Sequence, residues 1–167
     1  MGSSLRNWFQ AVDVDGNGQI TAEELQAALK KGNLNFSLAT VARMIRAFDK
    51  DSIGSIGFEE FEGLHLFLTQ LQSSFSHFDT DRDGKLAVQE VESAVKHAGF
   101  EIDVPAFMSM VQAFDPDRDG HLSLAEFIAL SLFMKNCRTV FAAFDPTNAG
   151  SVTMNFNQFL FAVSHIA

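Results

Sequence analysis

An acidic twelve-residue pattern that recurs at fixed intervals is the feature that most constrains the fold of this chain. The copies begin at Asp13, Asp49, Asp79, Asp115 and Asp145, so the intervals alternate between 36 and 30 residues. An interval of 36 leaves room for one helix, a short linker and a second helix, whereas an interval of 30 leaves no linker. Apolar residues recur every three or four positions in residues 58–78 and 124–144. This predicts one continuous helix of about 20 residues in each shorter interval.

The first copy, DVDGNGQITAEE, places oxygen-bearing side chains at alternate positions before a glycine. Thr21 and Glu24 form a Thr-x-x-Glu pair that could start a helix without any metal, and polar turns are common. That interpretation leaves the spacing unexplained, because the pattern is typical of loops that enclose calcium with six to eight oxygen atoms. The predicted ligands are Asp13, Asp15, Asn17, Gln19 through its backbone carbonyl, Thr21 and Glu24.

The third and fourth copies, DTDRDGKLAVQE and DPDRDGHLSLAE, keep the same ligand chemistry. The residue at position 7 contributes its backbone oxygen, and calcium prefers oxygen, so we expect the His121 carbonyl rather than its imidazole to bind. Ala87 at position 9 leaves one place to water. The predicted ligands are Asp79, Asp81, Asp83, Lys85 and Glu90 in one loop and Asp115, Asp117, Asp119, His121, Ser123 and Glu126 in the other.

The second and fifth copies have lost ligands. The second keeps Asp49, Asp51, Glu60 and the Ser55 carbonyl, but Ile53 and Gly57 replace two side-chain ligands, which predicts a weak or degenerate site. The fifth, DPTNAGSVTMNF, retains its first aspartate and its glycine but ends in phenylalanine instead of glutamate. We expect no calcium in that loop. Position 8 is apolar in every copy, which favours short strands that pair the loops: Ile20, Ile56, Leu86, Leu122 and Val152.

Composition excludes several functional classes. A formal net charge of −9 argues against nucleic-acid binding. Cys137 is the only cysteine, so the chain cannot form an internal disulfide, and one cysteine with five scattered histidines gives no signature of a catalytic nucleophile. No stretch of eighteen apolar residues without charge occurs, and no signal sequence is recognisable. We therefore expect a cytoplasmic calcium-binding protein that is not an enzyme.

Five such loops with alternating spacing and two shared helices resemble the penta-EF-hand family over residues 8–167. The resemblance implies an all-α fold, with short β-bridges between paired loops, in a single domain over residues 1–167. Its hands fall at about 3–32, 37–68, 69–99, 103–134 and 135–167. Hands one and two pair, as do three and four, and the fifth pairs with its equivalent in another subunit to give a homodimer or heterodimer.

The C-terminal region independently favours a dimer interface. Residues 152–166 contain no Asp, Glu, Lys or Arg, and an uncharged apolar terminus requires a covering surface. The alternative is that this region folds onto the core of its own chain. The predicted interface residues are Val152, Met154, Phe156, Phe159, Leu160 and Val163.

The resemblance further implies a calcium sensor or adaptor, in which calcium opens an apolar groove for a Pro-rich or amphipathic segment of a target protein. Two alternatives stay open: a regulatory subunit of a calpain-like cysteine protease, and a calcium buffer. Family members commonly carry a long Gly/Pro-rich N-terminal arm, whereas only seven residues precede Trp8 here. We therefore expect any membrane association to be indirect.

Overall fold

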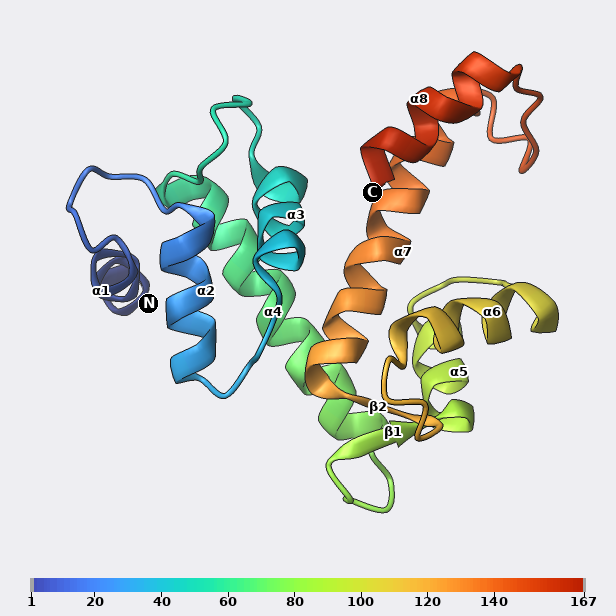
Figure 1. Cartoon of the computed structure of the whole chain (residues 1–167), viewed down its shortest axis with the longest axis horizontal. Helices are drawn as coiled ribbons and strands as arrows, with labels where there is room; N and C mark the ends of the chain where they lie inside the picture. The colour runs from blue at the N-terminus through green and yellow to red at the C-terminus, as the bar shows by residue number, and fades with distance from the viewer. Residues whose placement is uncertain (1, 167) are drawn as a thin grey trace.

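The computed structural model describes residues 2–166, which form eight helices and one small antiparallel sheet (Figure 1). The terminal residues Met1 and Ala167 of the predicted domain lie outside the described residues. The all-α prediction is confirmed, as is the prediction of two long shared helices, α4 and α7, each of 21 residues. The elements are α1 (Gly2–Val12), α2 (Ala22–Lys31), α3 (Leu38–Phe48), α4 (Phe58–Phe78), β1 (Lys85–Ala87), α5 (Val88–His97), α6 (Val104–Phe114), β2 (His121–Ser123), α7 (Leu124–Phe144) and α8 (Phe156–Ile166).

Side-chain hydrogen bonds explain where several helices begin. At the start of α2, Glu24 N donates to Thr21 Oγ1 and Thr21 N donates to Glu24 Oε2, which satisfies two backbone groups that the helix itself cannot pair. Ser123 and Glu126 repeat this capping box at the start of α7. Ser37 Oγ accepts from the backbone of the first turn of α3. The helix starts are therefore encoded by local sequence.

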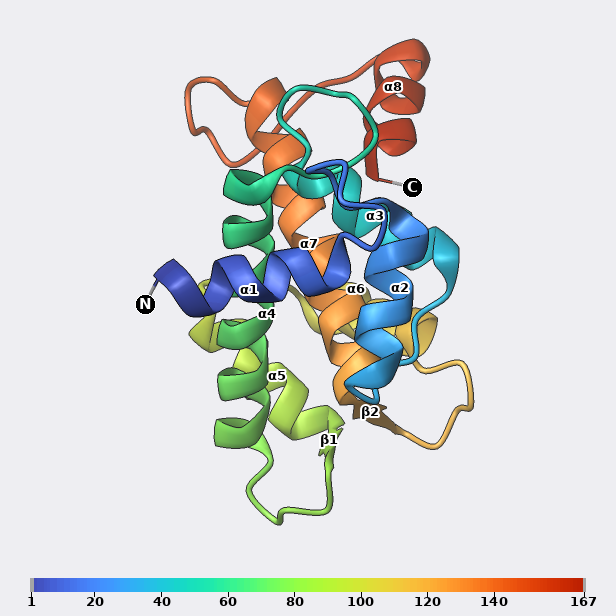
Figure 2. The same cartoon turned by 90° about the vertical axis from the view of Figure 1, so that its left-hand side faces the viewer.

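Two hydrophobic cores lie along the long helices, one in each half of the molecule. In Figures 1 and 2, α4 and α7 extend through both halves, with α1 to α3 around one half and α5 and α6 around the other. The first core consists of residues of α1 to α4 and their loops together with Ile128 and Leu132 of α7. The second is formed by Phe75, Leu86, Val91, Ala94, Val95, Phe107, Val111, Leu122, Phe127, Leu130 and Met134. Helix α7 therefore joins the two halves.

Helix α7 is also long and apolar enough, by length and composition alone, to cross a membrane. In the folded chain it instead contributes Ile128 and Leu132 to the first core and Leu130 and Met134 to the second. It also carries Lys135 and Arg138 in its second half. We therefore assign α7 as the central helix of the fold.

Short β-bridges join the loops in pairs, as predicted. Ile20 and Ile56 exchange backbone hydrogen bonds of 2.9 and 3.0 Å between the first two loops. Strands β1 and β2 pair the third and fourth loops, with Leu86 opposite Leu122. Four loops are therefore paired within the chain. Val152 of the fifth loop has no such backbone partner among the described residues.

Candidate calcium sites

Four of the five loops share one hydrogen-bond pattern around the first aspartate, whereas Asp79 of the third loop accepts, among the described residues, only from the N–H group at position 6, at 3.1 Å. The carboxylate of Asp13 accepts from the N–H groups at positions 5 and 6 at 3.1 and 2.9 Å. Asp49, Asp115 and Asp145 make the corresponding two bonds. The glycine at position 6 has a positive φ in every loop, between 73° and 84°, which a side chain would disfavour. The glycine thus turns the chain so that the aspartate faces the loop interior.

Carboxylates gather in four of these loops, with ligand oxygens within 4.8 Å of one another. Loop one combines two aspartates with its terminal glutamate, and loop two does the same with the three acidic residues that its sequence retains. In loops three and four the three aspartates converge, without the terminal glutamate. The clusters are Asp13, Asp15 and Glu24; Asp49, Asp51 and Glu60; Asp79, Asp81 and Asp83; and Asp115, Asp117 and Asp119. The described residues of loop five form no such cluster.

The remaining predicted ligands of loop one lie beside its acidic cluster. Asn17 Nδ2 donates to Asp15 Oδ2 at 2.9 Å, and Asn17 Oδ1 accepts from Gln19 N at 2.7 Å. The Thr21 hydroxyl donates to Glu24 Oε2 at 2.8 Å. The Asn17 and Thr21 side chains add two oxygen atoms to the carboxylates, and oxygen is the donor that a hard divalent cation prefers.

The glutamate at position 12 accepts a hydrogen bond from the backbone at position 2 in loops one, two and three, and so links the end of each loop to its beginning. Glu24 Oε1 accepts from Val14 N at 2.9 Å, and Glu60 Oε1 accepts from Lys50 N at 2.6 Å. In loop three, Glu90 Oε1 accepts from both the backbone and the hydroxyl of Thr80, a contact that the sequence reasoning missed. The Thr80 hydroxyl is the main cause that lowers the pKa of Glu90, and the Thr21 backbone is the main cause that lowers the pKa of Glu24. Both glutamates are thereby held as carboxylates.

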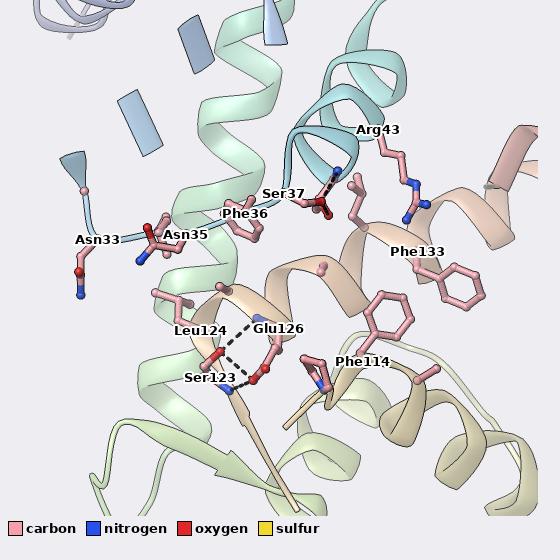
Figure 3. Close-up of a pocket in the computed structure, with 18 of the residues that line it drawn as sticks. Asn33, Asn35, Phe36, Ser37, Arg43, Phe114, Ser123, Leu124, Glu126 and Phe133 are labelled. Carbon is pink, nitrogen blue, oxygen red and sulfur yellow. Dashed lines mark hydrogen bonds between the residues drawn. The ribbon is translucent and has the colours of Figure 1, made fainter. Parts of the chain in front are cut away.

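Glu126 of loop four is placed differently. Its Oε2 accepts from the Ser123 backbone and hydroxyl, each at 2.8 Å, and these bonds are drawn in Figure 3. It lies at the edge of a cleft of about 690 Å³ between the α2–α3 linker, the end of α6 and the first half of α7. The glutamate therefore caps α7 in this structure, whereas the three aspartates of its loop face one another.

A cation fits these loops because their carboxylates lie close together and one carboxylate oxygen has no other partner among the described residues. Asp79 Oδ1 is buried and has no hydrogen-bond partner among the described residues, which is costly for a carboxylate oxygen. The adjacent Asp115 carboxyl raises the pKa of Asp117, and burial together with Asp49 and Glu60 raises the pKa of Asp51. Calcium supplies, when bound, two positive charges that neutralise such a cluster. The donor chemistry and the unpartnered oxygen both fit that ion.

The side chains at position 7 connect the loops of each pair. Lys85 Nζ forms an ion pair with Asp119 Oδ2, so an ammonium group of loop three contacts a predicted ligand of loop four. Asp119 is the main cause that raises the pKa of Lys85. In the first pair, Ser55 Oγ lies 3.4 Å from Gln19 Oε1. His121 Nδ1 lies 3.0 Å from Asp119 O. These contacts involve the side chains at position 7. They do not test whether the backbone carbonyls at that position bind calcium, so that role stays a prediction.

Comparisons with known proteins agree with this geometry. A family model described as an EF-hand domain pair matches residues 3–64 and 68–132. Sorcin of Schistosoma japonicum is 32% identical over 95% of this chain and 92% of its own length. A calcium-binding protein of Oryza sativa subsp. japonica is 31% identical over 93% of this chain and 54% of its own length. Peflin of Danio rerio is 30% identical over 92% of this chain, which spans 57% of that protein.

A solved structure provides a further match over the whole chain. It is a homolog of programmed cell death 6 protein from Leishmania major Friedlin, with 36% sequence identity and a TM-score of 0.76. The alignment covers 98% of this chain and 94% of that one. The chain spans about half the length of several curated relatives, but nearly all of this structure and of the Schistosoma sorcin. The chain therefore belongs to the penta-EF-hand family of calcium-binding proteins.

Proposed function

We propose that the protein is a calcium-dependent adaptor that dimerises through α8 and binds a segment of a target protein in an apolar groove. The observation that carries this proposal is the outer face of α8, which is apolar, free of charge and uncovered. Phe156, Phe159 and Leu160 are 71%, 53% and 49% exposed, and Val163 is also exposed. Burial of that much apolar surface favours association with a second apolar surface.

The attachment of α8 to the rest of the chain supports the same proposal. Helix α8 packs mainly on α7, where Phe161 contacts the Phe144 ring and Ala162 is buried. Among the predicted interface residues, Val152 and Met154 are half-buried. A second copy that paired its fifth loop with this one would cover the outer face of α8 and use the free pairing position of Val152. Such an arrangement would be a symmetric, self-complementary interface.

A candidate groove for a target segment lies between α4, α5 and α7. It is an apolar cavity of about 260 Å³, lined chiefly by Leu71, Val95, Phe100, Phe127 and Met134. The Arg138 guanidinium stacks 3.7 Å from the centre of the Phe100 ring, and its Nη2 donates to Gly99 O at 2.6 Å, across one side of this cavity. Because α4 and α5 flank the third loop, a change in their angle would widen the cavity. An amphipathic or Pro-rich segment suits a groove of this chemistry.

We expect a Phe159→Glu substitution to convert the dimer into a monomer. A carboxylate in the centre of an apolar interface would be desolvated without a partner, whereas it is solvated on the free surface of a monomer. Light scattering after gel filtration would measure a mass near 18.4 kDa for the variant and about twice that for the unmodified chain. Leu66→Glu is the control, because Leu66 is 56% exposed on α4, away from α8. An unmodified chain that is monomeric at micromolar concentration would contradict the dimer proposal.

We also expect calcium to increase the fluorescence of a dye that binds apolar surfaces. Opening of the helix pairs would expose groove residues such as Phe100 and Phe127, which are half-buried and buried here. The measurement is a dye titration with calcium, with magnesium as the ionic control. A calcium titration that fills the loops without any change in dye fluorescence would favour a calcium buffer over an adaptor. Capture of the chain by a larger protease subunit would favour the calpain-like alternative.

A further inference from the structure

A lysine of the third loop extends into the acidic cluster of the fourth loop. Lys85 stands at position 7 of its loop, in β1, directly opposite Ser123 of β2 (Figure 1). Its backbone N–H donates to Asp83 Oδ1 at 2.8 Å, within its own loop. Its side chain instead crosses to the neighbouring loop, where Nζ forms an ion pair with Asp119 Oδ2. Lys85 therefore places its backbone in one candidate calcium site and its charge in the other.

The ammonium group of Lys85 interacts with several carboxylates of loop four. Asp119 is the main cause that raises the pKa of Lys85, and the charges of Asp117 and Glu126 add to this effect. Asp119 Oδ1 accepts from His121 N at 2.8 Å, while Asp119 Oδ2 accepts from Lys85. Each oxygen of this predicted calcium ligand therefore already has a donor. A calcium ion in loop four must share Asp119 with Lys85 or displace the lysine.

The first pair of loops has uncharged side chains at the corresponding positions. Position 7 is Gln19 in loop one and Ser55 in loop two, and Ser55 Oγ lies 3.4 Å from Gln19 Oε1. In loop four, position 7 is His121, whose Nδ1 lies 3.0 Å from the backbone oxygen of Asp119 in its own loop. Among the four paired loops, Lys85 is therefore the one position 7 residue that the structure describes with an ion pair to the other loop of its pair.

A calcium ion and an ammonium group repel each other when both lie at one carboxylate. A bound calcium ion carries two positive charges, and Lys85 adds a third within the same acidic cluster. Because Lys85 is half-buried and Asp119 is exposed, water and salt weaken this repulsion, but they do not remove it at such short range. If Lys85 moves aside instead, its ion pair with Asp119 is lost. Each outcome makes calcium binding by loop four less favourable.

We propose that Lys85 is a competing internal cation that lowers the calcium affinity of the fourth loop. The fourth loop then fills at a higher calcium concentration than it would with an uncharged residue at position 85. The third loop is affected less, because Lys85 contacts that loop through its backbone. The inference concerns the calcium sites of the chain, so it depends neither on the adaptor function nor on the dimer.

A calcium titration of the full chain, followed by nuclear magnetic resonance with a chelator that buffers free calcium, tests the proposal loop by loop. The amide signals of Gly84 and Gly120 serve as separate reporters, because these N–H groups donate to the first aspartates of loops three and four. We expect Lys85→Gln to raise the affinity measured at Gly120 roughly fivefold and to change that at Gly84 less than about twofold. Glutamine retains the backbone carbonyl and is the residue that loop one has at this position.

Two control variants separate the local charge of Lys85 from its shape and from the net charge of the chain. Lys85→Arg keeps the charge and should leave the affinity at Gly120 within about twofold of that of the unmodified chain. Lys96→Gln removes the same charge from α5, where Lys96 pairs with Glu92, and should have an equally small effect. The gain from Lys85→Gln should shrink in about 0.5 M potassium chloride, because salt screens the repulsion between charges. An unchanged or lower affinity at Gly120 in Lys85→Gln, an equal gain in either control, or a gain that salt does not reduce would overturn the proposal.

Discussion

Replacing Glu24 with glutamine is expected to lower the calcium affinity of the first loop by roughly 100-fold, because EF-hand affinity depends strongly on the charge and number of the ligands. Glutamine keeps the length of the side chain and one oxygen, which can accept from Thr21 N as Glu24 Oε2 does, whereas the bond from Val14 N to Glu24 Oε1 is lost. It also still completes a capping box. The variant should therefore retain α2 and lose the negative charge together with the bond from Val14 N. Calorimetry should find one high-affinity site fewer than in the unmodified chain.

The neighbouring glutamate provides a matched control for this experiment. Glu23→Gln removes the same charge one residue earlier, on an exposed side chain of the first turn of α2. We expect nearly unchanged calcium binding in that variant. If Glu24→Gln and Glu23→Gln bound calcium equally well, Glu24 would be a capping residue only, and the first loop would have to be interpreted as a polar turn.

Leu86→Ala is expected to lower the free energy of unfolding by about 2–5 kcal/mol, the usual range for removing a fully buried leucine side chain. Leu86 is 0% exposed and stands opposite Leu122 in the bridge between the third and fourth loops. The cavity left by its side chain would separate two loops that are otherwise held together. Chemical denaturation would measure the loss of stability, and calcium titration would detect reduced cooperativity between these loops.

Leu66→Ala is the control for that substitution, because Leu66 is 56% exposed on α4. A surface change of this kind usually alters stability by less than about 0.5 kcal/mol. If both variants lost the same stability, the effect would come from the leucine-to-alanine change in general. The bridge between the loops would then have no special role in the fold.

The helices and loops could be predicted because their signals are local. The two long helices have the bounds that the apolar periodicity predicted, Phe58–Phe78 and Leu124–Phe144. The loop pairs followed from the apolar residue at position 8, which the Ile20–Ile56 bridge and the Leu86–Leu122 pair confirm. Each of these features depends on residues that are close in sequence or repeat at a fixed interval.

Features that depend on distant residues could not be predicted. The Lys85–Asp119 ion pair joins residues 34 positions apart, and the sequence assigned both only to their own loops. Local patterns contain no information about such contacts.

The shared helices also determine how far a local movement can extend. Helix α4 leaves the second loop and enters the third, and its 21 residues make it about 30 Å long. If the loop at one end turned such a rigid helix by about 10°, simple leverage would displace the other end by about 5 Å over that length. Helix α7 has the same length and ends at the fifth loop, next to α8. A reorientation at the fourth loop would therefore shift α8, and with it the position of any second subunit bound there.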